Sequence, residues 1–195
     1  MEIQAHGHAT VLVVCTGNIC RSPAVERLLA HALGPESGVG VGSAGVRAVV
    51  GAPMSAPMVE LVEAAGASAA GFTARQVTTP LVQNADLVLA MTRSHRAALV
   101  ELVPAAVRRT FTLRELARLL ADVDPEALPS GPVPERLAAL LPLAAAQRGR
   151  RTVDAREDDV VDPYGGGSRL YALAFRQLEP AVQMIAGHLL GEPVR

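Results

Sequence analysis

Lysine and tryptophan are absent from this sequence of 195 residues, and aromatic residues make up only 3% of it. All 18 basic side chains are therefore arginines, and 19 acidic side chains bring the formal net charge to -1. Binding to nucleic acid or to an anionic membrane surface needs a strongly basic field. The charge balance therefore predicts neither kind of partner.

Cysteine is scarce as well, because only Cys15 and Cys20 occur. Two cysteines this close in sequence cannot form the disulfide framework of a small secreted protein. No apolar run reaches the roughly 18 residues of a membrane span, and residues 1–10 lack the features of a signal peptide. We expect a cytoplasmic protein without membrane insertion, in which residues 1–9 form a flexible tail. His6 and His8 belong to that tail and are not expected to hold a metal.

The residues that are present predict a single α/β domain. Hydrophobic residues make up 50% of the chain, enough for a substantial core in one domain of this length. Four apolar runs are typical of buried parallel strands, namely residues 10–14, 39–43, 86–91 and 108–113. Helical patterns separate or follow them at residues 22–33, 54–65, 94–102, 113–121 and 169–190. Strands that alternate with helices indicate a parallel sheet.

Residues 122–159 break this alternation. They contain five prolines and the charged run RGRRTVDAREDD around the short apolar segment LAALLPLAAA. We interpret them as an insertion with one short helix. Long connections of this kind are either functional, for example as a lid over a site, or surface excursions without a role.

One glycine motif is misleading. Residues 40–45, GVGSAG, match the G-x-G-x-x-G fingerprint of dinucleotide-binding proteins. That fingerprint requires a helix that opens within it. Here VRAVVGAP follows, so no nucleotide cofactor is expected, and the chain also lacks the phosphate-binding motif of the NTPases.

The stretch VLVVCTGNICRS joins a strand to a helix through a loop suited to anions. The helix N-terminus directs free N–H groups at the loop, and Gly17 and Asn18 tolerate the backbone angles of an anion-binding nest. Arg21 can offer two parallel donors to phosphate oxygens, and Ser22 can donate to sulfur. Because the same field stabilises a thiolate, we expect Cys15 to be a nucleophile at neutral pH.

A second motif supplies a proton donor. Displacing an oxygen leaving group from phosphorus is easier when a positioned acid protonates it. Asp162 in VVDPYG is the candidate, because Pro163 stiffens the chain after it and Tyr164 can form an aromatic wall beside a substrate ring.

Together these motifs resemble the low-molecular-weight protein-tyrosine phosphatases, whose signature is an N-terminal C-x5-R-S loop and a distal D-P-[YF]. The segments VCTGNICRSP and DDVVDPYG match it, and SAG, ARQ and ADLVLAM are also similar to the family. The resemblance covers residues 11–102 and 160–190. It implies a four-stranded parallel sheet flanked by helices, and hydrolysis of phosphotyrosine in a protein substrate without metal or cofactor.

The resemblance also implies residue roles. Cys15 would be the nucleophile, Arg21 the phosphate clamp and Asp162 the general acid and then the general base. Phosphate or another oxyanion is expected in the loop, and Ser43 would help to hold that loop in shape. The implied substrate-binding and phosphate-binding residues are Thr16, Gly17, Asn18, Ile19, Cys20, Ser22 and Tyr164. Cys20 matches a cysteine that can form a reversible disulfide with the nucleophile and so protect it from oxidation.

Three departures from the family leave the substrate open. Thr92 stands where an aspartate is frequent, residues 71–73 lack a frequent histidine, and residues 46–50 carry no ring. An arsenate reductase on this fold would need further thiols, which the chain lacks. A protein-arginine phosphatase would carry Thr in place of Ile19, whose bulk favours a flat ring. A catalytically silent phosphate-binding module would not need the three catalytic side chains.

Two other carboxylates lie close to the proposed acid in the sequence and are not expected to act in its place. Asp158 and Asp159 also precede the D-P-Y motif, and we expect both to be solvated and nearly neutral to mutation.

Overall fold

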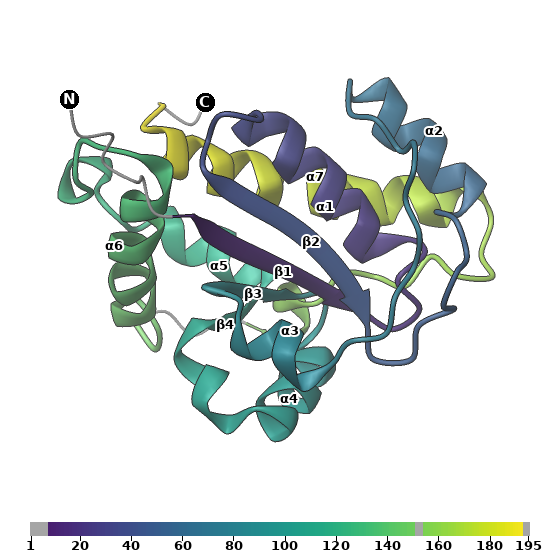
Figure 1. Cartoon of the computed structure of the whole chain (residues 1–195), viewed down its shortest axis with the longest axis horizontal. Coiled ribbons are helices and arrows are strands. Elements are labelled where there is room, and N and C mark those ends of the chain that lie inside the picture. The colour runs from purple at the N-terminus through teal and green to yellow at the C-terminus, as the bar shows by residue number, and fades with distance from the viewer. Residues whose placement is uncertain (1–7, 151–153, 193–195) are drawn as a thin grey trace.

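The computed structural model describes residues 8–150 and 154–192, and it has the predicted α/β architecture (Figure 1). In chain order its strands and α-helices are β1 (Ala9–Cys15), α1 (Arg21–Leu33), β2 (Val39–Gly45), α2 (Ala56–Ala64), α3 (Thr79–Gln83), β3 (Leu87–Ala90), α4 (Arg93–Leu102), β4 (Thr110–Thr112), α5 (Leu113–Leu120), α6 (Val133–Ala146) and α7 (Ser168–Leu190). Shorter 3-10 turns cover Pro104–Arg109, Pro125–Ala127 and Ala155–Asp158.

The four strands form one sheet in the order β2-β1-β3-β4. Every pairing is parallel, with Cys15 opposite Gly45 at the end of β1 and β2. The carboxyl ends of all strands therefore lie at one edge of the sheet. In an open parallel sheet this edge is where ligands bind.

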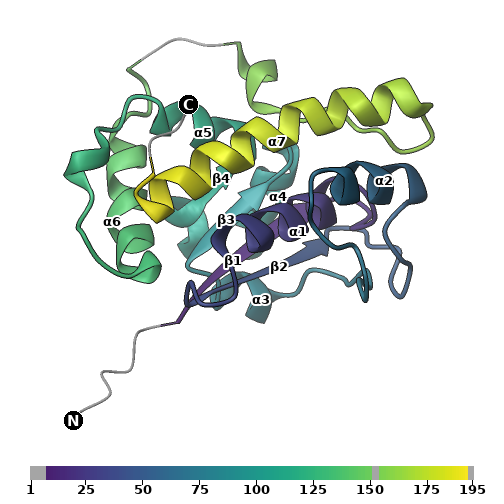
Figure 2. The ribbon, with the colours of Figure 1, turned by 90° about the horizontal axis from the view of Figure 1, so that it is seen from above.

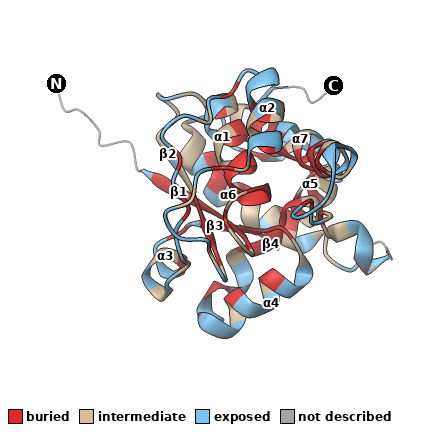
Figure 3. Ribbon diagram, turned by 90° about the vertical axis from the view of Figure 1, so that its right-hand side faces the viewer, coloured by how far each residue is buried: buried red, intermediate tan, exposed pale blue. Residues whose placement is uncertain are grey.

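Helices cover both faces of the sheet (Figure 2). Val11, Val13 and Cys15 of β1 belong to a large core packed with residues of α1, α2, α5, α6 and α7. Leu12 and Val14 face the opposite way, into a smaller core with residues of α3 and α4. β1, β3 and β4 are consequently almost entirely buried in the centre of the molecule (Figure 3), as expected for near-continuous apolar runs, whereas β2 buries only its last three residues.

The predicted strand over residues 108–113 is wrong at both ends. Arg108 and Arg109 lie in a 3-10 turn, and Leu113 is the first residue of α5. The boundary is set by a capping box, in which the Thr112 hydroxyl accepts from the Glu115 N–H and the Glu115 carboxylate accepts from the Thr112 N–H. This reciprocal pair starts a helix and ends the strand after three residues.

The prediction that residues 1–9 form a flexible tail is wrong for Ala9, which is buried and belongs to β1. His8 is exposed, and residues 1–7, with His6, lie outside the described part of the chain.

Residues 122–159 contain a longer helix than the sequence predicts. The apolar segment, residues 137–146, forms the last ten residues of α6, and its Leu137, Leu140 and Ala144 are buried in the large core. Arg136 on the same helix donates to the carbonyl oxygens of His188 and Leu189 at the end of α7, at 2.7 to 3.2 Å. Residues 133–146 are therefore part of the folded body of the protein. A role as a lid stays a prediction.

No helix among residues 8–150 and 154–192 is long and apolar enough to cross a membrane.

Candidate active site

The loop between β1 and α1 turns its carbonyl groups outward. The carbonyl oxygens of Thr16 and Gly17 each accept a hydrogen bond of 2.9 Å from backbone N–H groups in residues 46–49. The N–H groups of Ile19 and Cys20, by contrast, have no acceptor among the described residues. This is the backbone arrangement of an anion nest at a helix N-terminus.

Asn18 holds the loop in this shape. It is the only described non-glycine residue with a positive φ, 56°, and it is completely buried. Its Nδ2 donates to Ser22 Oγ at 2.9 Å and to Ser43 Oγ at 2.8 Å, while its Oδ1 accepts from the Arg75 N–H at 2.9 Å. An asparagine therefore fits this position twice, through its tolerance of the left-handed region and through its amide.

The same contacts fix the hydroxyl proton that reaches the cysteine. Ser43 Oγ donates to Glu26 Oε2 at 2.6 Å. The hydroxyl oxygens of Ser22 and Ser43 each accept one of the two Nδ2 protons of Asn18. The Ser22 hydroxyl proton then has Cys15 Sγ at 3.0 Å as its nearest acceptor. The Asn18 N–H adds a second donor at 3.3 Å. Two donors directed at one sulfur stabilise a thiolate.

Arg21 and Asp162 are 141 positions apart in the sequence and meet beside this loop. Arg21 Nη2 lies 2.7 Å from Asp162 Oδ2. Arg21 Nη1 donates to the Val160 carbonyl at 3.2 Å, and its buried Nε has no partner among the described residues. Such an orphaned donor on a guanidinium that is 3% exposed is what an oxyanion would satisfy.

The loop lines a cavity of about 170 Å³ that gathers most of the predicted site residues. Three predicted site residues do not line it but are buried away from it, namely Asn18, Ser22 and Ser43. The lining residues are Cys15, Thr16, Gly17, Ile19, Cys20, Arg21, Arg47, Val49, Asp162 and Tyr164. Arg47 and Val49 are additions that the sequence did not single out.

The rim of the cavity has more aliphatic than aromatic side chains. Tyr164 lines it but is 70% exposed, and Val49, 47% exposed, is the side chain that residues 46–50 contribute beside Arg47. Ile19 completes the apolar set. The walls can thus cover a flat ring with one aromatic and two aliphatic side chains.

His95 is a site residue that the sequence reasoning missed. Its Nε2 lies 2.8 Å from Thr16 Oγ1, and its Nδ1 lies 2.8 Å from Thr92 Oγ1. Burial and the nearby Arg21 charge lower the pKa of this histidine to about 4. The Thr92 hydroxyl also caps α4 by accepting from the His95 N–H, a T-x-x-H arrangement that a search for helix caps could have found.

Cys20 faces a different environment from Cys15. Its Sγ lies 3.5 Å from the Tyr171 hydroxyl, which also accepts from Ser55 Oγ at 3.0 Å. Both cysteines are free and buried. Burial raises the pKa of the Cys20 thiol, so at neutral pH this sulfur keeps its proton.

The expectation that Asp158 and Asp159 are solvated is wrong, because both side chains have protein partners, whereas their expected neutrality to mutation stays a prediction. Asp158 pairs with Arg118 through contacts of 2.9 to 3.3 Å. Asp159 Oδ1 accepts from the Arg93 N–H at 2.7 Å. Both carboxylates fasten the segment that leads to Asp162, and we expect their loss to affect stability more than chemistry.

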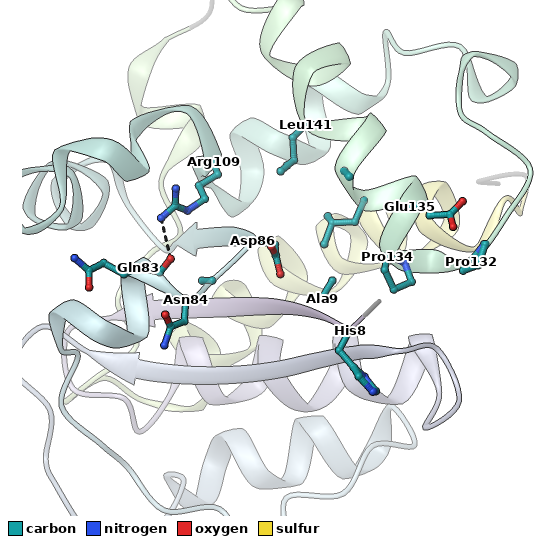
Figure 4. A pocket seen from close by; sticks show the side chains of 13 residues that line it. His8, Ala9, Gln83, Asn84, Asp86, Arg109, Pro132, Pro134, Glu135 and Leu141 are labelled. Carbon is teal, nitrogen blue, oxygen red and sulfur yellow. Dashed lines mark hydrogen bonds between the residues drawn. The ribbon is translucent and has the colours of Figure 1, made fainter. Parts of the chain in front are cut away.

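A larger cavity, of about 640 Å³, lies at the opposite edge of the sheet (Figure 4). It borders the amino ends of β1, β3 and β4 and the first half of α6. Its volume exceeds that of the cavity at the Cys15 loop, but no cysteine lines it. No cluster of three or more His, Cys, Asp or Glu side chains suited to a metal occurs within residues 8–150 and 154–192.

Known proteins resemble this chain in sequence and in fold. Residues 10–125 match the model of the family described as low molecular weight phosphotyrosine protein phosphatase. The chain is 42% identical over 102 residues to the low molecular weight protein-tyrosine-phosphatase Etp of Escherichia coli K12, covering 52% of this chain and 67% of that protein. It is 30% identical over 182 residues to a protein-arginine-phosphatase of Geobacillus stearothermophilus, covering 93% and 97%.

Solved structures agree. Wzb of Vibrio vulnificus in complex with benzylphosphonate superposes with a TM-score of 0.65 at 26% identity, covering 92% of this chain and 98% of that one. The YwlE arginine phosphatase from Geobacillus stearothermophilus superposes with a TM-score of 0.67 at 29% identity, covering 93% of each. The chain therefore belongs to the low-molecular-weight phosphotyrosine protein phosphatase family and is a phosphatase.

Proposed function

We propose that the protein hydrolyses phosphotyrosine in protein substrates through a phosphocysteine intermediate. The observation that carries this proposal is the meeting of Arg21 and Asp162 at 2.7 Å beside the Cys15 loop. A nucleophile with two sulfur-directed donors, a guanidinium with an orphaned N–H and a carboxyl group at one cavity are the parts that the reaction requires.

In the first step the Cys15 thiolate attacks phosphorus. An S–P bond forms as the bond from phosphorus to the phenolic oxygen breaks, and that oxygen takes a proton from Asp162. The Arg21 guanidinium and the loop N–H groups hold the three other phosphoryl oxygens. Because Asp162 pairs with Arg21 at 2.7 Å, an incoming phosphoryl group would take over the guanidinium, and the freed carboxyl group, carrying a proton, would then donate that proton to the leaving oxygen.

In the second step water attacks the phosphocysteine. Asp162, now ionised, accepts the proton of the water, an O–P bond forms, and the S–P bond breaks to return the Cys15 thiolate. Inorganic phosphate leaves the loop. The donors that Asn18 and Ser22 direct at sulfur favour the thiolate as the leaving group in this step.

The lining of the cavity supports an aryl substrate. Ile19, Val49 and Tyr164 offer apolar surface above the loop. A guanidine group would bring several N–H donors, and the only carboxyl group that lines the cavity within the described chain is Asp162, which the steps above use as the proton donor to the leaving group. Buried donors without acceptors are costly, so a phenyl ring fits this wall better.

Hydrolysis of phosphoarginine is the second candidate. It is favoured by the arginine-phosphatase relative, whose alignment spans 93% of this chain. Arsenate reduction has no comparable support, because a relay beyond Cys15 and Cys20 would need thiols that the sequence lacks.

A turnover panel separates these candidates. Phosphotyrosine, phosphoarginine and phosphoserine peptides are compared by kcat/KM, together with arsenate and a thiol reductant. We expect phosphotyrosine to be preferred, and Ile19→Thr to raise the phosphoarginine rate relative to the phosphotyrosine rate. Faster turnover of phosphoarginine by the wild type would overturn the substrate assignment while leaving the nucleophile in place.

Redox protection of Cys15 by Cys20 is a further part of the proposal. Peroxide would convert the Cys15 thiolate to a sulfenic acid, and the Cys20 thiol would then form a disulfide with it and release water. Brief peroxide treatment should inactivate the wild type reversibly and Cys20→Ser irreversibly. Equal recovery of both proteins after reduction would limit Cys20 to packing against Tyr171.

A further inference from the structure

His95 joins the carboxyl ends of two strands through its ring. Thr16, which follows β1, lies at its Nε2, and Thr92, which follows β3, lies at its Nδ1, each at 2.8 Å. The ring is buried. It touches neither Cys15 nor the Arg21–Asp162 pair through a hydrogen bond, so the reaction steps above give it no role.

The chemistry of a neutral imidazole constrains this bridge. Burial and the Arg21 charge keep the pKa of His95 near 4, whereas Asp162 and Asp159 raise it and Arg47 lowers it by smaller amounts. At neutral pH one ring nitrogen therefore donates and the other accepts. Thr92 Oγ1 already accepts from the His95 N–H at 3.2 Å, and its own proton can go to Nδ1.

The direction of the hydrogen bond between His95 and Thr16 matters because Thr16 lies at the cavity. It lines the catalytic cavity and also a neighbouring hollow of about 460 Å³ that contains His95. Arg21 and Asp162 are the other two residues that line both. If Nε2 carries the ring proton and donates to Thr16 Oγ1, the Thr16 hydroxyl proton is left for an acceptor in the loop.

We propose that the Thr16 hydroxyl is a side-chain donor to the bound phosphoryl group, and that His95 is the positioning residue that holds it in that role. The inference rests on the proposed function, because it places the phosphoryl group in the same loop. With the opposite tautomer, Thr16 would give its proton to the ring and present only lone pairs to an anion. Anion binding consequently selects the tautomer with the proton on Nε2.

Nitrogen NMR of the histidine rings tests the tautomer directly. Wild-type protein labelled with 15N-histidine is titrated with inorganic phosphate at neutral pH, and a His95→Gln spectrum identifies the His95 signals. We expect phosphate to fix the proton on Nε2 and to raise the pKa of the ring, because an added anion favours its charged form. A ring protonated on Nδ1 in the phosphate complex would overturn the proposal.

Inhibition by inorganic phosphate tests the donor itself. Thr16→Val should weaken phosphate inhibition roughly 10-fold, the scale of a lost hydrogen bond to a charged group, while Thr16→Ser should stay close to the wild type. Ser94→Ala is the matched control, because the exposed Ser94 hydroxyl contacts Thr92 at 2.8 Å but not Thr16. Undiminished phosphate binding by Thr16→Val would overturn the proposal.

A double-mutant cycle shows whether the two residues act together. His95→Leu and Thr16→Val should each weaken phosphate binding, and the double variant should be no weaker than the more affected single one. Additive losses would mean that His95 acts elsewhere. Should His95→Leu fail to fold, Thr16→Val and the wild-type spectra still decide. Phosphate carries no ring, so a failure on phosphotyrosine with normal phosphate results would reject the substrate alone.

Discussion

The two edges of the sheet carry cavities that differ both in size and in chemistry. The cavity at the amino ends, about 640 Å³, is larger than the one of about 170 Å³ at the carboxyl ends. In the larger one, Arg109 donates to the carbonyl oxygens of Val82 and Gln83, the contact with Gln83 being drawn in Figure 4, and Asp86 accepts from the Thr10 N–H. These contacts hold the fold, although the buried Arg109 Nε has no partner within the described chain.

The smaller cavity likewise has a buried guanidinium N–H without a partner, and it adds unpaired backbone donors. The Arg21 Nε and the N–H groups of Ile19 and Cys20 have no partner in the described chain. The backbone donors follow from the topology, since β1 ends and the helix after it begins at the carboxyl edge. The volume of a cavity measures how much can enter it, whereas hydrogen-bond donors without a partner indicate which kind of ligand it can bind.

The largest expected effect tests which cavity holds the chemistry. Cys15→Ser should lower kcat by at least ~10³-fold, because an alcohol in this loop is a far weaker nucleophile than a thiolate. It should still bind inorganic phosphate, measured by calorimetry. Glu135→Gln in the larger cavity is the control and should keep wild-type kinetics. The opposite pattern would assign the reaction to the amino edge.

Asp162→Asn should have the next largest effect. Loss of a general acid costs roughly 10²–10⁴-fold, and the loss should be steep for phosphotyrosine and smaller for an activated aryl phosphate, whose phenolate leaves with little help. The basic limb of the kcat/KM profile should flatten.

Asp158→Asn is the comparison for this variant. It should lower the free energy of unfolding by breaking the pair with Arg118 and leave turnover in place. Loss of turnover in Asp158→Asn with full retention in Asp162→Asn would show that the acid has been assigned to the wrong carboxylate.

Arg21→Lys keeps the charge and changes its shape. We expect kcat/KM to fall by at least ~10²-fold, because an ammonium group cannot reach two phosphoryl oxygens as a planar guanidinium does. It would also lose one of the contacts that Arg21 makes with Val160 and Asp162. Steady-state kinetics with an aryl phosphate measure the effect, and near-normal values would mean that the phosphoryl group lies elsewhere.

The sequence predicts the smaller cavity well because its parts are local. Strand, loop and helix N-terminus follow one another over residues 11–22, and each has a recognisable signal. Asp162 was identified by its own motif, although only folding brings it to Arg21.

Residues without a motif of their own were missed. Glu26 is bonded to Ser43 across 17 positions, and His95 to Thr16 across 79 positions. A glutamate on α1 and a histidine on α4 look like ordinary helix residues until the strands are placed side by side. The three-residue strand β4 was overextended for a related reason, since Leu113 is as apolar as a strand residue and only the capping box assigns it to a helix.

Acid should distinguish the two edges through stability. Asp86 and Glu135, which line the larger cavity, are exposed. His95, at the carboxyl edge, is buried. With a pKa of about 4 in the folded protein and about 6.5 when unfolded, His95 binds its proton in the unfolded state first as the pH falls.

Stability should consequently be lost between about pH 6.5 and pH 4, by up to about 3 kcal/mol from this one group. Urea unfolding across that range measures the slope, and His95→Gln, which cannot titrate, should flatten it by this amount relative to the wild type. His31→Gln, which replaces an exposed histidine on α1 by the same residue, is the control for the substitution itself. Identical slopes for His95→Gln and the wild type would show that the buried ring accepts its proton as readily as an unfolded one, and the bridge between Thr16 and Thr92 would then have to tolerate a charged imidazole.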